Sequence, residues 1–271
     1  MTAPVSAPPA GPSALPPVRA TVARALALVR QHPREALLPL AVIQLPVTLA
    51  TAALTIVLYL TAFKNEPVET MQGALSGGAS APLFVFAVTA AVEGLFAQVA
   101  RAASIVSIAA VARGRPLPLT SALDPAFTRM GALLVLVLII AVGFGLAFVT
   151  IVGLVLLPYV ATRVALCFEA MVLEGIGPWA AIRRSWSLTR GNVLRLLGVI
   201  LLSVLVVLIP LVLISALGTA IGGGRTTRVV LTGLYTFVQG GLAIPLAGFL
   251  TATTTLYYLT IGAPSDDRRS A

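Results

Sequence analysis

Four ionisable residues stand inside long apolar stretches of the sequence, where a charge can bind an ion, move a proton or pair with an opposite charge. Glu93 and Arg101 belong to one stretch, and Arg163 and Glu169 belong to another. If both stretches cross a membrane in the same direction, similar distances from their ends mean similar depths. This reasoning predicts two stacked ion pairs, Glu93 with Arg163 and Arg101 with Glu169, because pairing avoids a cost of several kcal/mol for an isolated buried charge.

These four charges also allow a functional interpretation, which is an ion or proton relay through a polar cavity. Gln98 and Tyr159 lie at similar predicted depths and could take part in such a relay. Four charges that neutralise one another fit structural pairing better than a pathway. We therefore expect the pairs to hold helices together, and the relay remains the alternative.

A second chemically active group lies between two apolar stretches, over residues 178–190. Pro178 suits the first position of a helix, and Gly191 suits the residue just past its end. Trp179, Ile182 and Trp186 follow at spacings of three and four, which predicts one apolar stripe on this helix. Both tryptophans of the chain are here, and amphipathic rings prefer the headgroup layer of a membrane.

Basic side chains accompany this stripe, and each arginine near a membrane surface contributes about 1 kcal/mol toward binding anionic lipid. The segment could also do no more than orient the apolar stretch that follows it. Six residues are predicted to face lipid or a partner protein: Trp179, Arg183, Arg184, Trp186, Arg190 and Arg195.

The composition of the whole chain explains where these groups must act. Of 271 residues, 58% are hydrophobic and 10% are charged, and the mean hydropathy is +1.02. Soluble domains carry roughly 25% charged residues, so the surface of this chain must be covered by lipid. The net charge of +9 does not indicate nucleic-acid binding, because the arginines lie beside apolar runs rather than on a solvated face.

A membrane span needs about 20 apolar residues, and the sequence offers six such spans. The apolar run from 131 to 173 is about twice the hydrocarbon thickness as one helix, so we expect it to fold back near Thr150 to Gly153. The predicted spans are Ala36–Phe63, Pro82–Val111, Gly131–Phe148, Gly153–Leu173, Val193–Ala216 and Val229–Leu259.

The distribution of basic residues predicts the orientation of these spans. If the amino terminus is cytoplasmic, thirteen arginines fall on the inner side and three basic residues on the outer side, which is a strong positive-inside bias. We therefore predict an all-α, polytopic membrane helix bundle with both termini in the cytoplasm. The expected location is a bacterial cytoplasmic membrane.

The predicted organisation is a single membrane domain with two tails. Residues 1–18 form a tail rich in proline and alanine, which we expect to be disordered, and residues 263–271 form a short polar cytoplasmic tail. Residues 19–262 form the six-span domain. Its first part, from Val18 to Arg34, predicts a short amphipathic helix on the membrane surface.

A spaced motif covers the fourth span and the basic segment after it. The residues Pro158, Arg163, Glu174-Gly175, Ala181, Ser185, Leu188 and Thr189-Arg190-Gly191 read as P-x4-R-x10-E-G-x5-A-x3-S-x2-L-T-R-G. This run resembles the membrane domain named after bacterial glycerophosphoryl diester phosphodiesterases, and the similarity extends from about Arg19 to Gly262. The resemblance implies the form of the family without the catalytic barrel. That hydrolase needs a pair of histidines with several carboxylates, whereas this chain contains His32 alone.

We therefore expect no catalytic, cofactor or metal site. Cys167 is a single cysteine, which excludes a multi-cysteine metal site. Three functional classes follow in order of preference. The first is a scaffold or accessory subunit that contacts anionic lipid or a membrane partner. The second is a transporter or permease component with a polar site between the second, fourth and sixth spans, and the third is a membrane-embedded enzyme.

Overall fold

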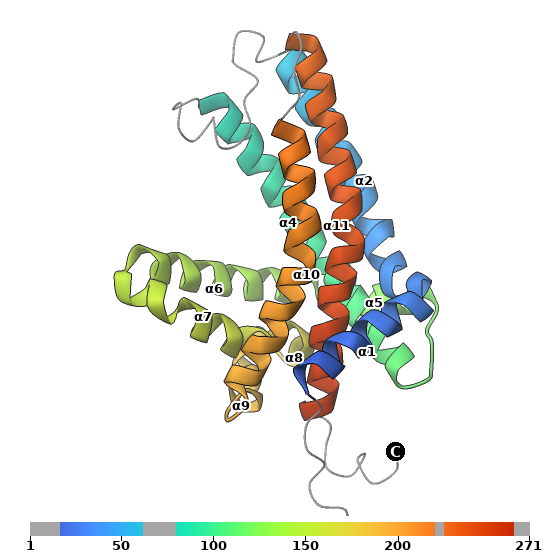
Figure 1. Cartoon of the computed structure of the whole chain (residues 1–271), viewed down its shortest axis with the longest axis vertical. Helices are drawn as coiled ribbons and strands as arrows, with labels where there is room; N and C mark the ends of the chain where they lie inside the picture. Colours follow the sequence, from blue (N-terminus) through green and yellow to red (C-terminus); the bar gives the residue numbers. More distant parts are fainter. Residues whose placement is uncertain (1–16, 62–79, 220–224, 263–271) are drawn as a thin grey trace, which may run out of the picture.

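The computed structural model describes residues 17–61, 80–219 and 225–262, and over these residues the chain is helical with no strand (Figure 1). The prediction of an all-α fold is therefore confirmed. Most residues of the two predicted tails lie outside the described ranges. The helices are α1 (Val18–Gln31), α2 (Pro33–Thr61), α4 (Ser80–Ala112), α5 (Leu119–Thr128), α6 (Met130–Val149), α7 (Ile151–Val164), α8 (Cys167–Glu174), α9 (Pro178–Leu188), α10 (Val193–Thr219) and α11 (Arg225–Gly262).

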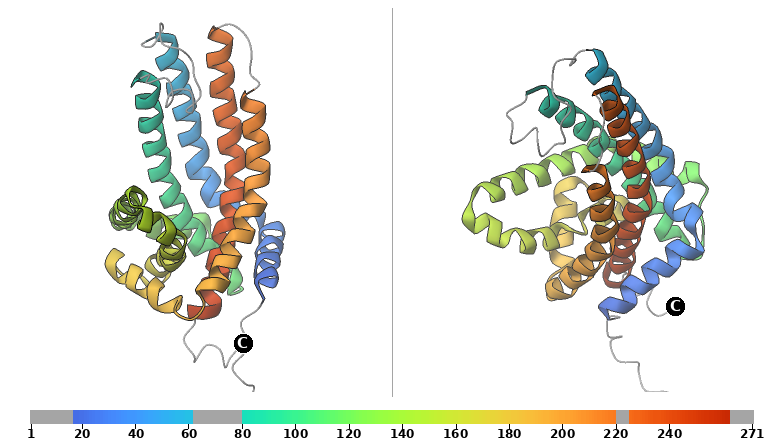
Figure 2. Two further views of the ribbon diagram at one scale, coloured as in Figure 1. Left: turned by 60° about the vertical axis from the view of Figure 1, so that its left-hand side comes forward. Right: turned by 45° about the horizontal axis from the view of Figure 1, so that its top comes forward.

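The four long helices form one layer in the order α4, α2, α11, α10 (Figure 2). Close contact between α2 and α11 depends on glycine. A Cβ atom on Gly240 would lie 2.3 Å from Cγ2 of Thr48, and one on Gly248 would lie 2.5 Å from Cδ2 of Leu37. Because neither glycine has a side chain, the two helices approach closely, as small residues commonly allow within membranes.

The four short helices α1, α5, α8 and α9 gather near one end of this layer, where α11 also ends (Figure 1). Helix α1 confirms the short helix predicted near the amino terminus, and it packs on α10 and α11 with Val22 and Ala25 among its buried residues. Helix α8 is buried from Cys167 to Val172. The largest hydrophobic cluster therefore lies toward this end of the molecule.

The hairpin of α6 and α7 differs from the rest of the chain in direction. It extends sideways from the layer of long helices, and both figures agree on this (Figures 1 and 2). The turn falls where it was predicted, since the Gly153 N–H donates to Oγ1 of Thr150 at 3.0 Å. A Cβ atom on Gly153 would lie 2.1 Å from the carbonyl oxygen of Ala147, so this turn requires glycine.

The sequence predicted that these two helices would stand beside the other spans, and the structure does not place them there. Helix α6 has no charged residue, and only 11% of its most apolar window is buried inside the chain. A helix that is apolar on all sides carries no stripe that selects a neighbouring helix. Its direction could therefore not be read from its sequence.

In the described ranges, five helical segments are long and apolar enough to cross a membrane, and a sixth arises if α9 and α10, which meet at 105°, count as one bent span. The first four predicted spans each overlap one of the five segments. The sixth predicted span lies within α11, and its apolar window is Gly240–Gly262. The chain thus has the helices of a multi-pass membrane protein.

Candidate functional site

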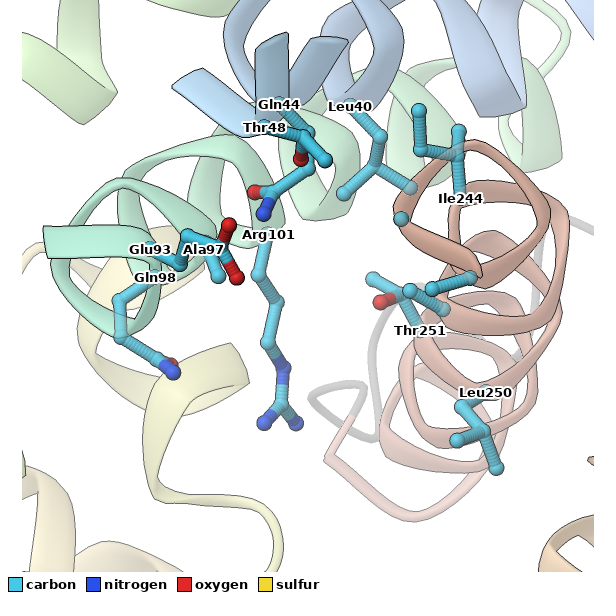
Figure 3. Close-up of a pocket in the computed structure, with 13 residues that line it drawn as sticks. Leu40, Gln44, Thr48, Glu93, Ala97, Gln98, Arg101, Ile244, Leu250 and Thr251 are labelled. Carbon is cyan, nitrogen blue, oxygen red and sulfur yellow. The ribbon is translucent and has the colours of Figure 1, made fainter. Parts of the chain in front are cut away.

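A cavity of about 490 Å³ lies between α2, α4 and α11, and Figure 3 shows the side chains around it. Sites for small molecules typically measure roughly 300–1,000 Å³. The cavity has six aliphatic residues in its wall: Leu40, Ala97, Ala243, Ile244, Ala247 and Leu250. The other lining residues are Gln44, Thr48, Glu93, Gln98, Arg101, Gly240 and Thr251.

Helical periodicity explains how these residues come to face one space. On α2 the lining residues recur every fourth position, at 40, 44 and 48, and on α4 they recur at 93, 97 and 101. Residues four apart share one face of a helix. On α11 small residues predominate at the cavity, including Gly240, Ala243 and Ala247, and their size leaves the space unfilled.

Glu93 enters this space, and no residue that the structure describes supplies it with a basic partner. Its carboxylate accepts a hydrogen bond from the hydroxyl of Thr51, and its side chain is half-buried. Among the residues that the structure describes, no lysine, arginine or histidine nitrogen lies within 4.0 Å of it. Figure 3 shows the carboxylate pointing toward the cavity.

The predicted pair of Glu93 with Arg163 is therefore wrong. Arg163 belongs to the sideways hairpin, and its guanidinium donates to the hydroxyl of Tyr159 at 2.8 Å and to the carbonyl oxygen of Trp186 at 3.1 Å. It also stacks on both rings, with Cζ 5.1 Å from the Tyr159 centroid and 5.3 Å from the Trp186 centroid. The equal-depth argument failed because it assumed that α4 and α7 are parallel.

The second predicted pair is present. The guanidinium of Arg101 lies 3.3 Å from Oε1 of Glu169, and its Cζ lies 4.7 Å from the centroid of the Phe168 ring. Glu169 is completely buried, and its carboxylate also accepts from the hydroxyl of Thr254 at 2.5 Å. These contacts join α4, α8 and α11 at the side of the cavity where Arg101 lies.

Three buried polar atoms of the cavity residues lack a hydrogen-bond partner: Oγ1 of Thr48, Oε1 of Gln98 and Nε of Arg101. Thr48 itself is 1% exposed. Leaving a buried donor or acceptor unsatisfied costs about 1–3 kcal/mol, so such atoms are rare unless water or a ligand satisfies them. The residues around the cavity therefore include a carboxylate without a basic partner among the described residues and three buried polar atoms whose hydrogen-bonding capacity is unused.

The basic segment at α9 is only partly available for binding. Trp179 is 59% exposed and Trp186 is 38% exposed, and Cζ of Arg183 lies 5.9 Å from the Trp179 centroid. Arg190 is exposed and Arg195 is half-buried. The tryptophan stripe thus faces outward, and Ala181 and Ser185 form the buried face of this helix.

Arg184 differs from the prediction for this segment, because it is held by an acidic neighbour. Its Nε donates to both carboxylate oxygens of Glu174, at 2.9 and 3.1 Å. This hydrogen bonding raises the pKa of Arg184 above its usual value. The hydroxyl of Tyr258 donates to Glu174 as well, so the three residues connect α8, α9 and α11.

The spaced motif builds the junction of α7, α8 and α9. The hydroxyl of Ser185 donates to the carbonyl oxygen of Arg163 at 2.6 Å and accepts from the Leu166 N–H at 3.2 Å. Gly175 has a φ of 72°, and a Cβ atom there would lie 2.8 Å from Nη2 of Arg129. The glutamate, glycine and serine of the motif thus have structural roles.

Comparisons of the chain with protein-family models, with curated proteins and with solved structures found no match. The resemblance of the spaced motif to the phosphodiesterase-associated membrane domain therefore stays a prediction. In the described ranges, no group of three or more histidine, cysteine, aspartate or glutamate residues is arranged to hold a metal ion.

The contribution of α2 to the cavity was not predicted from the sequence. The sequence predicted a polar site between the second, fourth and sixth spans, whereas α7 does not line the cavity and α2 does. The signal was present as Gln44 and Thr48, four residues apart in a span without charge, with Thr51 one turn further. Such residues are easily overlooked, because a threonine hydroxyl in a helix can bond its own backbone, as Thr55 does to the carbonyl oxygen of Thr51.

Proposed function

We propose that this protein is a non-enzymatic transporter or permease component that binds a small molecule within the membrane. One observation carries the proposal: the cavity between α2, α4 and α11 contains a carboxylate with no basic partner among the described residues. A scaffold would have no need of such a cavity. Ionisable groups that face a cavity within a membrane mark substrate or ion pathways in many proteins.

The depth of the cavity supports this proposal. Glu93 lies thirteen residues after the start of α4, and Arg101 lies eleven residues before its end. At about 1.5 Å per residue these distances are about 20 and 17 Å, so the cavity is close to the middle of the helix. Substrate sites of secondary transporters lie near the middle of the bilayer.

The proposal includes a topology. We propose that α2, α4, α10 and α11 cross a bacterial cytoplasmic membrane with both termini inside, because the arginine-bearing short helices α1 and α9 are at one end of the molecule (Figure 1). The hairpin of α6 and α7, which the sequence counts as two more spans, would complete six only if it turned to lie beside these four helices. Arg115, which is exposed in the loop between α4 and α5, is then cytoplasmic. A cysteine at this position should react with a membrane-impermeant thiol reagent only from the cytoplasmic face.

The transport proposal is tested with a cysteine in place of Ala97, which lines the cavity. In the wild-type chain Cys167 is buried, so it supplies the unlabelled background, and Ala103→Cys supplies a second buried control. Inverted and right-side-out vesicles are treated with a charged, impermeant methanethiosulfonate. We expect Ala97→Cys to react from both faces. Labelling from neither face, or from one face alone, would overturn transport through this cavity.

A second function is favoured by the exposure of Trp179 and Trp186 on α9. We propose that α9 binds anionic lipid headgroups, with Arg183 and Arg190 supplying the charge, so that the protein also serves as a membrane-organising or accessory subunit. The test compares nanodiscs of phosphatidylcholine with and without phosphatidylglycerol. Arg183→Gln with Arg190→Gln should abolish enrichment of phosphatidylglycerol around the protein, and unchanged enrichment would contradict this role.

A further inference from the structure

We infer that the cavity selects an organic cation with an apolar body, and that Glu93 is its counter-ion. This inference rests on the proposed function and names the chemical class of the ligand. The charges of the cavity provide the first step. Arg101 is neutralised by Glu169 at 3.3 Å, so Glu93 leaves the site with an excess of one negative charge.

The negative charge of Glu93 needs a positive charge to balance it. Among the described residues, Glu93 accepts a hydrogen bond from the neutral hydroxyl of Thr51, which orients the carboxylate but does not neutralise it. Glu93 is half-buried beside aliphatic walls, and a carboxylate in such partly desolvated surroundings is stabilised by a nearby opposite charge. The described part of the chain supplies no such charge within ion-pair distance, so a cationic ligand is the group that would balance it.

The remaining lining of the cavity indicates what the rest of the ligand is like. Thr48 and Gln98 line the same cavity, and each has a covered polar atom without a hydrogen-bond partner, which can accept from an ammonium group once a side-chain rotation uncovers it. The aliphatic walls offered by α2, α4 and α11 suit a hydrocarbon body rather than a hydrated metal ion. An anionic ligand would meet repulsion from Glu93, and a neutral alcohol would leave its charge unbalanced.

A pair of thiol reagents of opposite charge tests this inference at Ala97→Cys. One is the trimethylammonium-ethyl methanethiosulfonate and the other is the sulfonato-ethyl compound, and each rate is divided by its rate with a free thiol. We expect the cationic reagent to react about tenfold faster, since attraction of about 1.4 kcal/mol gives that factor. Glu93→Gln should remove this preference, whereas Glu93→Asp should keep it. Asp124→Asn, at an exposed carboxylate on α5, should change nothing.

A binding measurement then tests the organic part of the inference. Radiolabelled hexylammonium and 1-hexanol have the same chain and differ in charge, and both are measured by equilibrium dialysis with the full chain in phosphatidylcholine nanodiscs. We expect saturable binding of hexylammonium that weakens about tenfold in Glu93→Gln, and no saturable binding of hexanol. Empty nanodiscs give the blank for partition into lipid.

The possible results separate this inference from the proposed function. If neither reagent reaches the cysteine, the cavity is closed and the proposed function itself fails. If both reagents react at equal normalised rates, the cavity is open but does not select cations, and the inference is overturned. Equal binding of hexylammonium to wild type and Glu93→Gln would also overturn it.

Discussion

Two glutamates near the cavity, Glu169 and Glu93, have opposite surroundings. Glu169 on α8 is completely buried and is bound by the guanidinium of Arg101 and the hydroxyl of Thr254. Glu93 on α4 is half-buried, and its carboxylate accepts from Thr51 and points toward open space. The first has its charge balanced by the protein and joins three helices. The second retains an unbalanced charge, which is the condition for binding something else.

The largest expected effect comes from removing the two charges one at a time. Glu169→Gln should lower the free energy of unfolding by about 3 kcal/mol, because it removes the charge of a fully buried carboxylate that pairs with the partly exposed Arg101. Glu93→Gln should change it by less than about 0.5 kcal/mol, since the amide still accepts from Thr51 and no basic partner is left behind. Unfolding in mixed micelles with increasing dodecyl sulfate measures both. Equal losses would show that the two sites do not differ.

Removing both members of the buried pair should reverse most of this loss. Arg101→Met combined with Glu169→Leu replaces the pair by apolar groups, which is often neutral for stability. We expect unfolding within about 1 kcal/mol of wild type, measured in the same micelles. A double variant as unstable as Glu169→Gln would mean that α8 needs the charge itself.

The threonines that bond the two glutamates give a smaller contrast. Thr254→Val removes a hydrogen bond to a fully buried carboxylate and should cost about 2 kcal/mol, as bonds to charged groups commonly do. Thr51→Val removes the equivalent bond from a carboxylate that faces the cavity, where water can replace it. Here we expect a loss below about 1 kcal/mol. Similar losses in the two variants would place Glu93 in a site as dry as that of Glu169.

The smallest effect is expected between Glu93 and Arg163. In a double-mutant cycle of Glu93→Gln and Arg163→Gln, the coupling energy should be zero within about 0.5 kcal/mol, because the side chains belong to separate sites. The same cycle on Arg101 and Glu169 provides the positive control. A coupling above about 1 kcal/mol would restore the pair that the equal-depth argument predicted.

The sequence sufficed where a simple physical length or cost determined the answer. The rise of the helix and the thickness of a bilayer predicted most of the membrane-length segments and the turn at Thr150 to Gly153. The cost of a buried charge predicted the pairing of Arg101 with Glu169. Prediction from the sequence failed for the direction of the α6–α7 hairpin, because nothing in the apolar α6 indicates that the hairpin leaves the layer of long helices. Once α7 lay elsewhere, Arg163 could not reach Glu93.

The cavity was predictable only in part, for a related reason. Its charged residues are easily recognised in an apolar stretch. Its α2 wall contributes the polar residues Gln44 and Thr48, which are uncharged and therefore less conspicuous in a membrane-spanning sequence. The position of α2 beside α11 depends on close contacts at Gly240 and Gly248. A glycine in a membrane helix indicates close packing without naming the partner.

Ser185 of α9 bonds the junction between α7 and α8, and this has a consequence for how the chain is made. Ser185 contacts the carbonyl oxygen of Arg163 and the N–H of Leu166, and in the interior no water can take its place. During synthesis those two backbone groups wait without this partner until about twenty more residues have left the ribosome. Because α9 is synthesised after α7 and α8, the junction of α7 and α8 can reach its final structure only once α9 has formed.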